Sequence, residues 1–268
     1  MDNTSLGDRM KDYEKRFTDI SLVPRIPCII RLDGRSFHSY TRMFKTTTVE
    51  PPFSQDMKDA MVYAIKKTCN DGVSGIRAVY QQSDEITFYF HDEDPRSQGW
   101  FDYNVQKMDS VLCSIFTAHF NNFILNICHN RASYNTVATF DARAFNLPNE
   151  IEVNNCFLWR QLDFYRNSIN MVGRAHFSHK QMNNLNTDQV QDLLYRERGI
   201  NWNNLDAWKK RGVLVIKKTI IKDVEFLNKK TGKMETQKGV RRHEWTEVEC
   251  PIFSQVPLFQ LLRDTEKD

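Results

Sequence analysis

Short apolar segments separated by polar loops dominate the first half of the chain. Four of them are rich in β-branched and aromatic residues, which is typical of buried strands. They span residues 28–32, 77–82, 86–90 and 136–140, and the last ends at Asp141. Acidic elements stand at strand ends: Asp33-Gly34 follows the first segment, and Ser83-Asp84-Glu85 connects the second to the third. We therefore expect Asp33 and Asp84 to be neighbours.

Apolar residues at helical spacing predict two helices between these strands. Ser54 is a suitable N-cap for the first, in which Met57, Met61 and Ile65 recur on one face. The second is predicted over residues 104–122, where a broad apolar stripe runs along one side. The resulting order of strand, helix, strand, strand, helix and strand is the split βαβ or ferredoxin-like pattern of an α+β fold. In this layout the helices cover one face of the sheet and leave the other open.

The second half predicts a helical elaboration followed by a β-hairpin. Pro148 can start a long helix that continues to about Val172, and Thr187 caps a shorter helix that Gly199 ends. Strands are then predicted over 213–218 and 240–248, with a basic turn at 229–233 between them. No break in composition separates two domains. A catalytic core (1–145) and a basic part (146–268) are therefore expected to pack as one unit.

Composition predicts a globular protein of a reducing compartment, and we expect it in the cytoplasm. The 268 residues are 40% hydrophobic, which is enough for a substantial core. No apolar run approaches the roughly 20 residues that span a bilayer, and the charged start lacks the apolar stretch of a signal peptide. The six cysteines are scattered without a Cys-x-x-Cys spacing. Membrane association is not expected.

The charge is unevenly divided along the chain. Residues 155–268 carry 20 Lys and Arg against 14 Asp and Glu, a net charge of +6, whereas residues 1–154 carry 17 against 20, a net charge of −3. This division suits an enzyme that holds a polyanion on one part and a metal on the other. The alternative is an uneven solvated surface. Four basic pairs suit phosphate contacts with RNA: 209–211, 217–218, 229–230 and 241–242.

Asp33 and Asp84 have the chemistry of a magnesium site. Two carboxylates can bridge a pair of Mg²⁺ ions about 3.5–4 Å apart, which serves phosphoryl or nucleotidyl transfer because the ions stabilise both the attacking and the leaving oxygen. Acidic residues at strand ends also cap turns, so the two carboxylates alone leave a structural role open. Glu85 is harder to place, because successive residues in an extended chain point to opposite faces.

Further motifs favour the catalytic interpretation. The run Arg31-Leu32-Asp33-Gly34-Arg35-Ser36-Phe37-His38, followed by Gln82-Ser83-Asp84-Glu85, closely resembles the signature of the tRNA-His guanylyltransferase family. The resemblance extends over roughly residues 5–220. The other motifs that carry it are Phe101-Asp102-Tyr103 through Lys107, Phe140-Asp141-Ala142-Arg143, Trp159-Arg160-Gln161, Asn201-Trp202-Asn203 and Arg211-Gly212-Val213.

The resemblance implies a palm-like reverse polymerase that adds nucleotides to the 5′ end of tRNA after ATP activates the 5′ phosphate. By position, Asp33 and Asp84, with the Gly34 carbonyl, correspond to ligands of two Mg²⁺ ions, and Glu85 to a supporting catalytic carboxylate. The residues that would bind ATP, GTP or other nucleoside triphosphates are Asp33, Gly34, Arg35, Ser36, Phe37, His38, Lys45, Ser83, Asp84 and Lys107. The family also implies a homo-oligomer, a tetramer.

One segment departs from the guanylyltransferases proper. Where those enzymes carry a His-Ile-Asn-Asn motif, this chain reads Asp163-Phe164-Tyr165-Arg166-Asn167-Ser168-Ile169-Asn170. It is similar to the guanylyltransferase-like branch, which repairs or edits 5′-truncated tRNAs. Three alternatives stay open: an orthodox tRNA-His guanylyltransferase, a non-catalytic RNA-binding module and a nucleotide cyclase. The RNA contacts expected are Arg160, Arg166, Asn167, Lys209, Lys210 and Arg211.

Two candidates carry less weight. His176 and His179 have a spacing that could bind metal on a helix, but no cysteine or second pair completes a zinc site. Trp159 and Phe157 on the long helix are expected to be core or subunit contacts rather than stacking platforms for bases.

Overall fold

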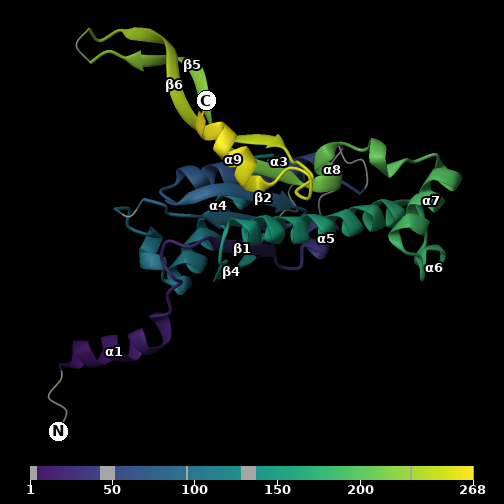
Figure 1. The fold of residues 1–268 in the computed structure, drawn as a ribbon, viewed down its shortest axis with the longest axis horizontal. Coiled ribbons are helices and arrows are strands. Elements are labelled where there is room, and N and C mark those ends of the chain that lie inside the picture. Colours follow the sequence, from purple (N-terminus) through teal and green to yellow (C-terminus); the bar gives the residue numbers. More distant parts are fainter. Residues whose placement is uncertain (1–4, 43–51, 95, 128–136, 230, 268) are drawn as a thin grey trace.

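A computed structural model describes residues 5–42, 52–94, 96–127, 137–229 and 231–267. Its centre is one antiparallel sheet of six strands in the order β4-β1-β3-β2-β5-β6 (Figure 1). The strands are β1 (Cys28–Gly34), β2 (Ile76–Gln82), β3 (Glu85–Phe90), β4 (Phe140–Asn146), β5 (Val213–Leu227) and β6 (Met234–Glu249).

The predicted ferredoxin-like core is confirmed. Between β1 and β2 runs α3 (Gln55–Asn70), and between β3 and β4 runs α4 (Val105–Ile127), which gives the strand order 4-1-3-2. The side chain of Ser54 caps α3 by accepting a hydrogen bond of 3.3 Å from the Met57 N–H. These two helices pack together against one face of the sheet.

The first core cluster fills the space between the sheet and these helices. From the strands it takes Ile30, Leu32 and Phe88, and from α4 it takes Phe116 and Phe120, all fully buried. By length and composition alone, α4 would be able to cross a membrane. One stripe of this helix packs into the core cluster. It consists of Met108, Leu112, Phe116, Phe120 and Ile124.

The position predicted for the fourth strand is wrong. The structure begins β4 at Phe140, where the prediction ended it; residues 137–139 lie outside any strand, and residue 136 lies outside the described residues. The reason is that β4 is an edge strand, with Asp141 and Arg143 exposed at alternate positions, so it lacks a continuous apolar run. The shift matters because it pairs Asp141 with Asp33 and Phe140 with Gly34.

The second face of the sheet is not left open, contrary to expectation. Helix α5 (Glu150–His176) crosses it, and Phe157 on this helix packs against Tyr80 and Phe253 at ring-centroid distances of 5.9 and 5.5 Å. Helix α9 (Leu258–Lys267), which the sequence pattern did not predict, contributes the buried Leu258 to the same cluster. Docking of α5 is a tertiary event that the strand pattern alone does not encode.

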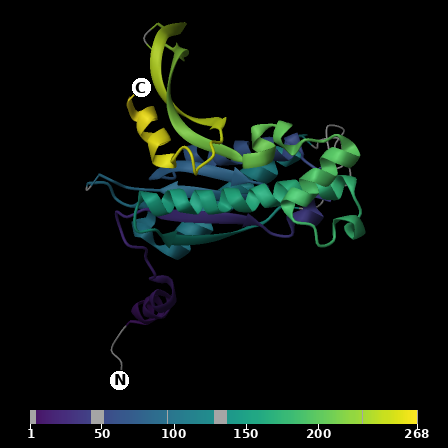
Figure 2. The same ribbon diagram turned by 45° about the vertical axis from the view of Figure 1, so that its right-hand side comes forward.

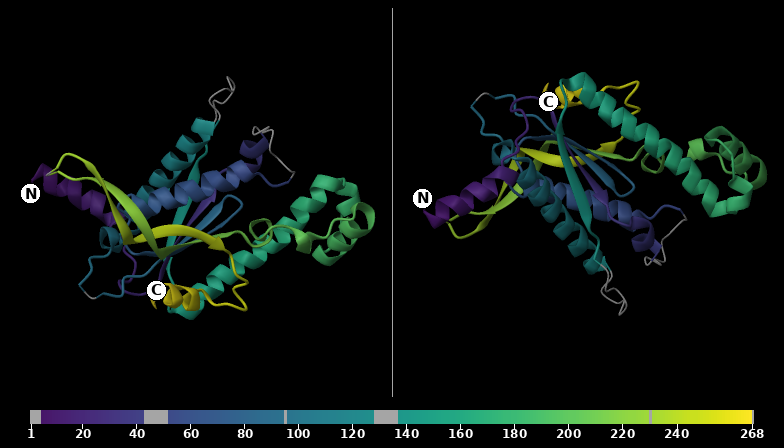
Figure 3. Two further views of the ribbon diagram at one scale, coloured as in Figure 1. Left: turned by 90° about the horizontal axis from the view of Figure 1, so that it is seen from above. Right: turned by 90° about the horizontal axis from the view of Figure 1, so that it is seen from below.

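Helix α5 extends past the sheet and carries the helical elaboration (Figure 3). It begins after the N-cap Asn149 and ends at His176, beyond the predicted end at Val172. The cap of α7 is Asn186 rather than Thr187, whereas Gly199 ends that helix in the left-handed conformation, as predicted. The elements of this part are α6 (His179–Met182), α7 (Thr187–Arg198), η2 (Trp202–Asn204) and α8 (Ala207–Arg211).

Two elements project from the body. The strands β5 and β6 leave the sheet after Ile216 and continue as a long two-stranded ribbon, while the unpredicted helix α1 (Leu6–Thr18) extends in another direction (Figures 1 and 2). Short helices complete the chain: α2 (Phe37–Arg42) and η1 (Trp100–Tyr103). The described cysteines form no disulfide, and burial raises the pKa of the Cys28 thiol to about 12.

Phe157 tests the contribution of the second face to stability. Its ring is fully buried between α5 and the sheet, so we expect Phe157→Ala to reduce the free energy of unfolding by about 3–5 kcal/mol in urea titrations. Ile151→Ala, on the same helix but 64% exposed, is the matched control and should change it by less than about 1 kcal/mol. Equal effects of the two substitutions would contradict the packing described.

Candidate active site

The two acidic elements meet at one end of the sheet. The Gly34 N–H, directly after Asp33, donates a hydrogen bond of 3.1 Å to the backbone carbonyl of Asp84. Strands β1 and β3 pair Asp33 with Glu85, and directly opposed residues of an antiparallel pair share a face. Asp33 and Asp84 are therefore neighbours, as the sequence predicted.

A glycine is required at position 34 because an aromatic ring lies against it. A Cβ atom there would be 2.3 Å from Cδ2 of Phe37. That ring is buried and packs on Tyr40 and Phe140 at centroid distances of 4.9 and 5.0 Å. The side chain of Phe37 thus belongs to the core, so the predicted nucleotide contact of this residue would have to come from its backbone.

Both acidic elements contain a residue in the left-handed region. Ser36 has φ of 54° and Ser83 has φ of 49°. Such conformations cost of order 1 kcal/mol or more for residues other than glycine and concentrate at functional sites. The turn conformation also lets the Ser83 hydroxyl donate a hydrogen bond of 2.9 Å to the Asp84 carboxylate.

Charge balance distinguishes the acidic residues at this end. Glu85 is ion-paired with Arg160, and Asp141 with Arg143 at 3.2 Å. Among the described side chains, neither Asp33 nor Asp84 has an ion-pair partner. Burial raises the pKa of Asp84, and the charges of Asp33 and Glu85 add to the increase. Two uncompensated carboxylates at one point are suited to a divalent cation.

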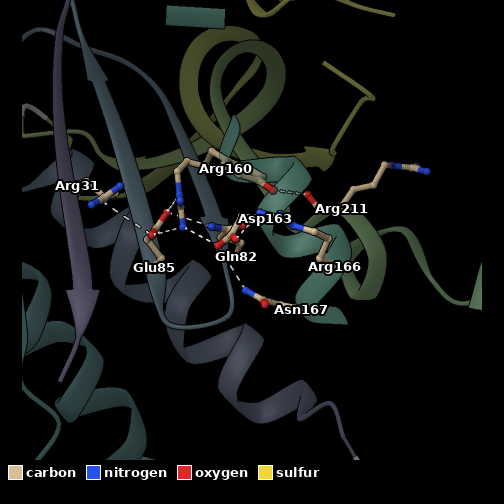
Figure 4. Close-up of polar contacts among 9 residues, drawn as sticks. Arg31, Gln82, Glu85, Arg160, Asp163, Arg166, Asn167 and Arg211 are labelled. Carbon is tan, nitrogen blue, oxygen red and sulfur yellow. Dashed lines mark hydrogen bonds and ion pairs between the residues drawn. The ribbon is translucent and has the colours of Figure 1, made fainter. Parts of the chain in front are cut away.

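Glu85 lies opposite Asp33 but is bound by protein partners. Arg160 on α5 donates two hydrogen bonds to it, from Nε at 2.5 Å and from Nη2 at 2.7 Å, and Gln82 donates a third at 3.0 Å (Figure 4). The Arg31 Nε atom lies 3.9 Å from the same carboxylate. Glu85 is therefore engaged by protein partners.

The other residues predicted to bind nucleotide after Asp33 differ in whether they are exposed. Arg35, Ser36 and His38 are exposed beside Asp33. The backbone N–H groups of Gly34 and Arg35 already donate to the carbonyls of Asp84 and Thr139, so these two groups are not available to phosphate oxygens. Contacts to a triphosphate must come from the exposed side chains and from later backbone groups.

The two predicted lysines are not brought to this site. Lys107 lies in the first turn of α4, 13 residues and about 20 Å of helix before Phe120, which packs on Phe37. The structure thus separates Lys107 from Asp33 within this chain, because α4 starts at the far end of the sheet. Lys45 lies outside the described residues.

The predicted RNA contacts are mostly engaged within the protein. Lys209 pairs with Asp206 at 2.9 Å, the Lys210 ammonium donates to the Asn203 carbonyl, and Arg211 binds Glu249 at 2.7 Å. Arg160 is engaged by Glu85. Arg166 pairs with Asp163, yet its side chain is 64% exposed. Asn167, the following residue of α5, is also exposed. Arg166 and Asn167 are therefore the accessible members of this set.

The sequence did not single out Asp141 as a site residue, although it occurs in a quoted motif. It lies opposite Asp33 on the neighbouring strand, and only the correct register of β4 shows this. Of the two aromatic residues expected to be core or subunit contacts, Phe157 is in the core. Trp159 is 53% exposed and is therefore not part of the core. The guanidinium carbons of Arg160 and Arg31 lie 4.5 and 5.5 Å from the centroid of the Trp159 ring, which gives two cation–π contacts.

Another group of metal-type ligands lies at the opposite end of the sheet. In the part of the chain that the structure describes, His91, Glu93 and Glu150 place ligand atoms within 4.8 Å of one another. Their charges are balanced, because Arg77 lies 4.0 Å from Glu93 and Arg263 lies 3.4 Å from Glu150. The spacing of His176 and His179 suits a metal site on one helix. In the structure they lie on two helices, because α5 ends at His176 and α6 begins at His179.

Comparison with known proteins agrees with the motifs. Residues 7–148 match the profile of the family described as tRNAHis guanylyltransferase. A probable tRNA(His) guanylyltransferase of Drosophila melanogaster is 26% identical over 78% of this chain and 74% of its own. The chain belongs to the tRNA-His guanylyltransferase family.

Solved structures similar to this chain include a guanylyltransferase-like protein and an orthodox enzyme of the family. A bacterial guanylyltransferase-like protein in complex with ATP has a TM-score of 0.79 and 37% identity over 97% of this chain and 99% of its own. The enzyme of Saccharomyces cerevisiae has a TM-score of 0.65 and 20% identity over 76% of this chain and 91% of its own, and it shares the fold.

Asp84 should reduce stability as long as no cation is bound. Because its folded-state pKa is raised, the folded protein binds this proton more tightly than the unfolded chain, so stability falls as pH rises through the two pKa values. We expect Asp84→Asn to raise Tm by about 2 °C at pH 7 without Mg²⁺. The gain should shrink below pH 3.8, the ordinary Asp pKa.

Differential scanning calorimetry with and without MgCl₂ measures this effect in the guanylyltransferase-family protein. Mg²⁺ should raise Tm of the wild type more than that of Asp84→Asn. Asp192→Asn, an exposed position on α7, is the control and should leave Tm unchanged. A lower Tm for Asp84→Asn at pH 7 would contradict the charge assignment.

Proposed function

We propose that the protein is a 3′-to-5′ nucleotidyltransferase that extends the 5′ end of tRNA. The observation that carries the proposal is the pair Asp33 and Asp84, joined through the bond from Gly34 N–H to the Asp84 carbonyl and lacking a protein cation among the described residues. Neighbouring Glu85 and Asp141 each have an arginine. The uncompensated pair therefore fits a bound cation better than a turn cap.

The donor set fits Mg²⁺. Carboxylates are the hard oxygen ligands that this ion prefers, and Asp84 is ionised only at a desolvation cost that a cation would offset. Asp33, Asp84 and the Gly34 carbonyl would hold the ions. When bound, Mg²⁺ supplies neutralisation of the charge that develops on the transferring phosphate.

The chain's own residues would orient two substrates around this point. The first reaction joins the tRNA 5′ monophosphate to AMP from ATP and releases pyrophosphate. In the second, the 3′ hydroxyl of a nucleoside triphosphate attacks the activated 5′ phosphate, and AMP leaves. The exposed side chains of Arg35, Ser36 and His38 lie where they would bind triphosphate oxygens, and Ser83 fixes the Asp84 carboxylate.

Repair of 5′-truncated tRNAs is the activity favoured within the family. The segment 163–170 lacks the His-Ile-Asn-Asn motif of the orthodox enzymes, and on α5 its first residue, Asp163, is connected through Arg160 to Glu85 next to Asp84. The bacterial guanylyltransferase-like structures, with ATP or GTP bound, are 37% and 35% identical to this chain. The orthodox addition of one G to tRNA-His is the alternative, and a non-catalytic RNA-binding module is less favoured because both carboxylates are present.

Extension assays decide between these activities. Labelled 5′-truncated tRNAs and full-length tRNA-His are incubated with the protein, ATP, the four nucleoside triphosphates and Mg²⁺. Repair predicts addition of the nucleotide that pairs with the opposite base of the acceptor stem, changed when that base is changed. Asp84→Ala should reduce the rate by at least about 10³-fold, since it removes an ion ligand.

The other outcomes are equally distinct. A single G added to tRNA-His alone would identify the orthodox enzyme. RNA binding that persists in Asp84→Ala, with no extension by the wild type, would identify a binding module. Asp102→Ala, an exposed carboxylate on η1, is the control and should extend RNA at the wild-type rate.

We also propose that the protein is a homo-oligomer in which α1 contacts a second copy. One face of this projecting helix carries Leu6, Met10, Tyr13 and Phe17, which are 67%, 49%, 56% and 84% exposed. Apolar residues at this spacing form one stripe, and the opposite face is charged of both signs. A stripe left in water favours burial against a matching surface.

Light scattering after size exclusion tests this contact. Phe17→Asp combined with Tyr13→Asp should lower the molar mass to that of a smaller assembly or monomer at micromolar concentration. Lys11→Asp, on the charged face of the same helix, should leave it unchanged. Equal masses for all three proteins would exclude α1 from the subunit contact.

A further inference from the structure

Arg160 makes a buried two-point contact with the turn that carries Asp84. Its Nε and Nη2 atoms lie 2.5 and 2.7 Å from the two oxygens of Glu85, and both side chains are only 11% exposed (Figure 4). This parallel arrangement is the strong bidentate form of an arginine–carboxylate pair. Helix α5 is thereby fastened to the first residue of β3.

The contact fixes the base of the β2–β3 turn. Gln82 and Glu85 are register partners at the two ends of Ser83-Asp84, and the Gln82 amide donates to Glu85 at 3.0 Å. Arg160 therefore acts on both arms of the turn through one carboxylate. The orientation of Asp84, whose carbonyl accepts the Gly34 N–H, depends on that turn.

The same contact sets the charge beside the proposed metal ligands. Glu85 lies opposite Asp33 on the same face of the sheet, so its negative charge adds to those of Asp33 and Asp84 unless it is neutralised. The Arg160 guanidinium, which makes both hydrogen bonds to Glu85, provides most of that neutralisation, and Arg31 at 3.9 Å adds to it. Without it, a buried carboxylate would either repel its neighbours or turn towards the cation and compete with the proper ligands.

The contacts of Arg160 continue along α5 towards solvent. Its Nη2 atom also lies 3.0 Å from Asp163, which in turn accepts from Arg166 at 3.1 Å and from Asn167 at 3.4 Å. This connects the accessible residues of the segment 163–170 to the turn of Asp84. Arg160 itself is enclosed, so an RNA phosphate would have to displace Glu85 to reach it.

We infer that Arg160 is a positioning residue that holds the Asp84 turn through Glu85 and neutralises Glu85, rather than a ligand of RNA. Glu85 is then the partner of Arg160 and not a third metal ligand. The inference rests on the proposed function, because the turn it positions is that of the proposed magnesium site.

The test compares Arg160→Met, Glu85→Gln and the double variant. Methionine replaces the arginine stem with an unbranched apolar side chain, and glutamine keeps the shape of glutamate. The double variant therefore removes both charges of the pair and leaves Arg31 as the guanidinium beside position 85. Arg160→Met alone should lower kcat for 5′ extension at least 100-fold, with RNA Kd within twofold of the wild type. Adding Glu85→Gln should recover at least tenfold of the lost kcat.

The magnesium dependence provides a readout that a purely structural contact would not change. In Arg160→Met the extra negative charge should lower the Mg²⁺ concentration for half-maximal rate at least threefold, and Glu85→Gln should reverse this shift. Arg160→Lys keeps the positive charge but cannot make the two parallel hydrogen bonds of a guanidinium. It should therefore retain the wild-type Mg²⁺ dependence with a reduced kcat. Arg174→Met, an exposed arginine of α5, is the control for the substitution itself.

Two results would overturn the inference. One is a double variant as impaired as Arg160→Met, with RNA Kd raised tenfold or more and a flatter salt dependence, which would make Arg160 an RNA ligand. The other is an unchanged Mg²⁺ dependence in Arg160→Met. If the wild type extends no RNA, the proposed function fails. The contact is then tested by urea unfolding of the wild type, Arg160→Met, Glu85→Gln and the double variant. A double-mutant cycle in which the unfolding equilibrium constants show a coupling of at least tenfold supports the contact, and no coupling rejects it.

Discussion

The hydrogen bond from the Gly34 N–H to the Asp84 carbonyl is the contact on which the candidate site depends. It joins the end of β1 to the β2–β3 turn, and the pairing of β1 with β3 places Asp33 in register with Glu85 just beside it. Gly34 makes this possible because the Phe37 ring occupies the space that a Cβ atom would need. Two segments about fifty residues apart thus become one acidic end of the sheet.

Helix α5 supplies the arginine that neutralises Glu85 at this acidic end. Burying carboxylates together is unfavourable unless each is compensated. Arg160 compensates Glu85 and Arg143 compensates Asp141, and the pair left without a protein cation, Asp33 and Asp84, is the one that fits Mg²⁺. The segment of α5 that differs from the orthodox enzymes continues from Arg160 on the same helix. Helix α5 thus carries both Arg160, which binds the turn of Asp84 through Glu85, and the segment from which the substrate class is proposed.

The sequence predicted the ferredoxin-like core because periodicity and capping are local. Ser54 and the alternation of Ile86, Phe88 and Phe90 needed no tertiary information. The misplaced β4 had its signal hidden by the exposed Asp141 and Arg143. The surroundings of Lys107 and Lys209 could not be predicted for another reason: residue type and motif position do not say at which end of the sheet a helix begins, or whether a lysine finds an internal partner such as Asp206.

Family resemblance identified the acidic pair, and the geometry refined the roles around it. It separated Glu85 from Asp84, transferred Phe37 to the core and left Arg166 and Asn167 as the accessible polar residues on α5. It also left Asp33 and Asp84 without an ion-pair partner among the described side chains, which is the observation behind the proposed cation site.

The most direct test of the account is the position of a bound cation. Crystals of the protein with Mn²⁺ in place of Mg²⁺ and a non-hydrolysable ATP analogue would locate the ion by anomalous scattering. The account predicts density between the carboxylates of Asp33 and Asp84, with Glu85 still bound to Arg160. Density at His91, Glu93 and Glu150 alone, or an ion ligated by Glu85, would contradict it.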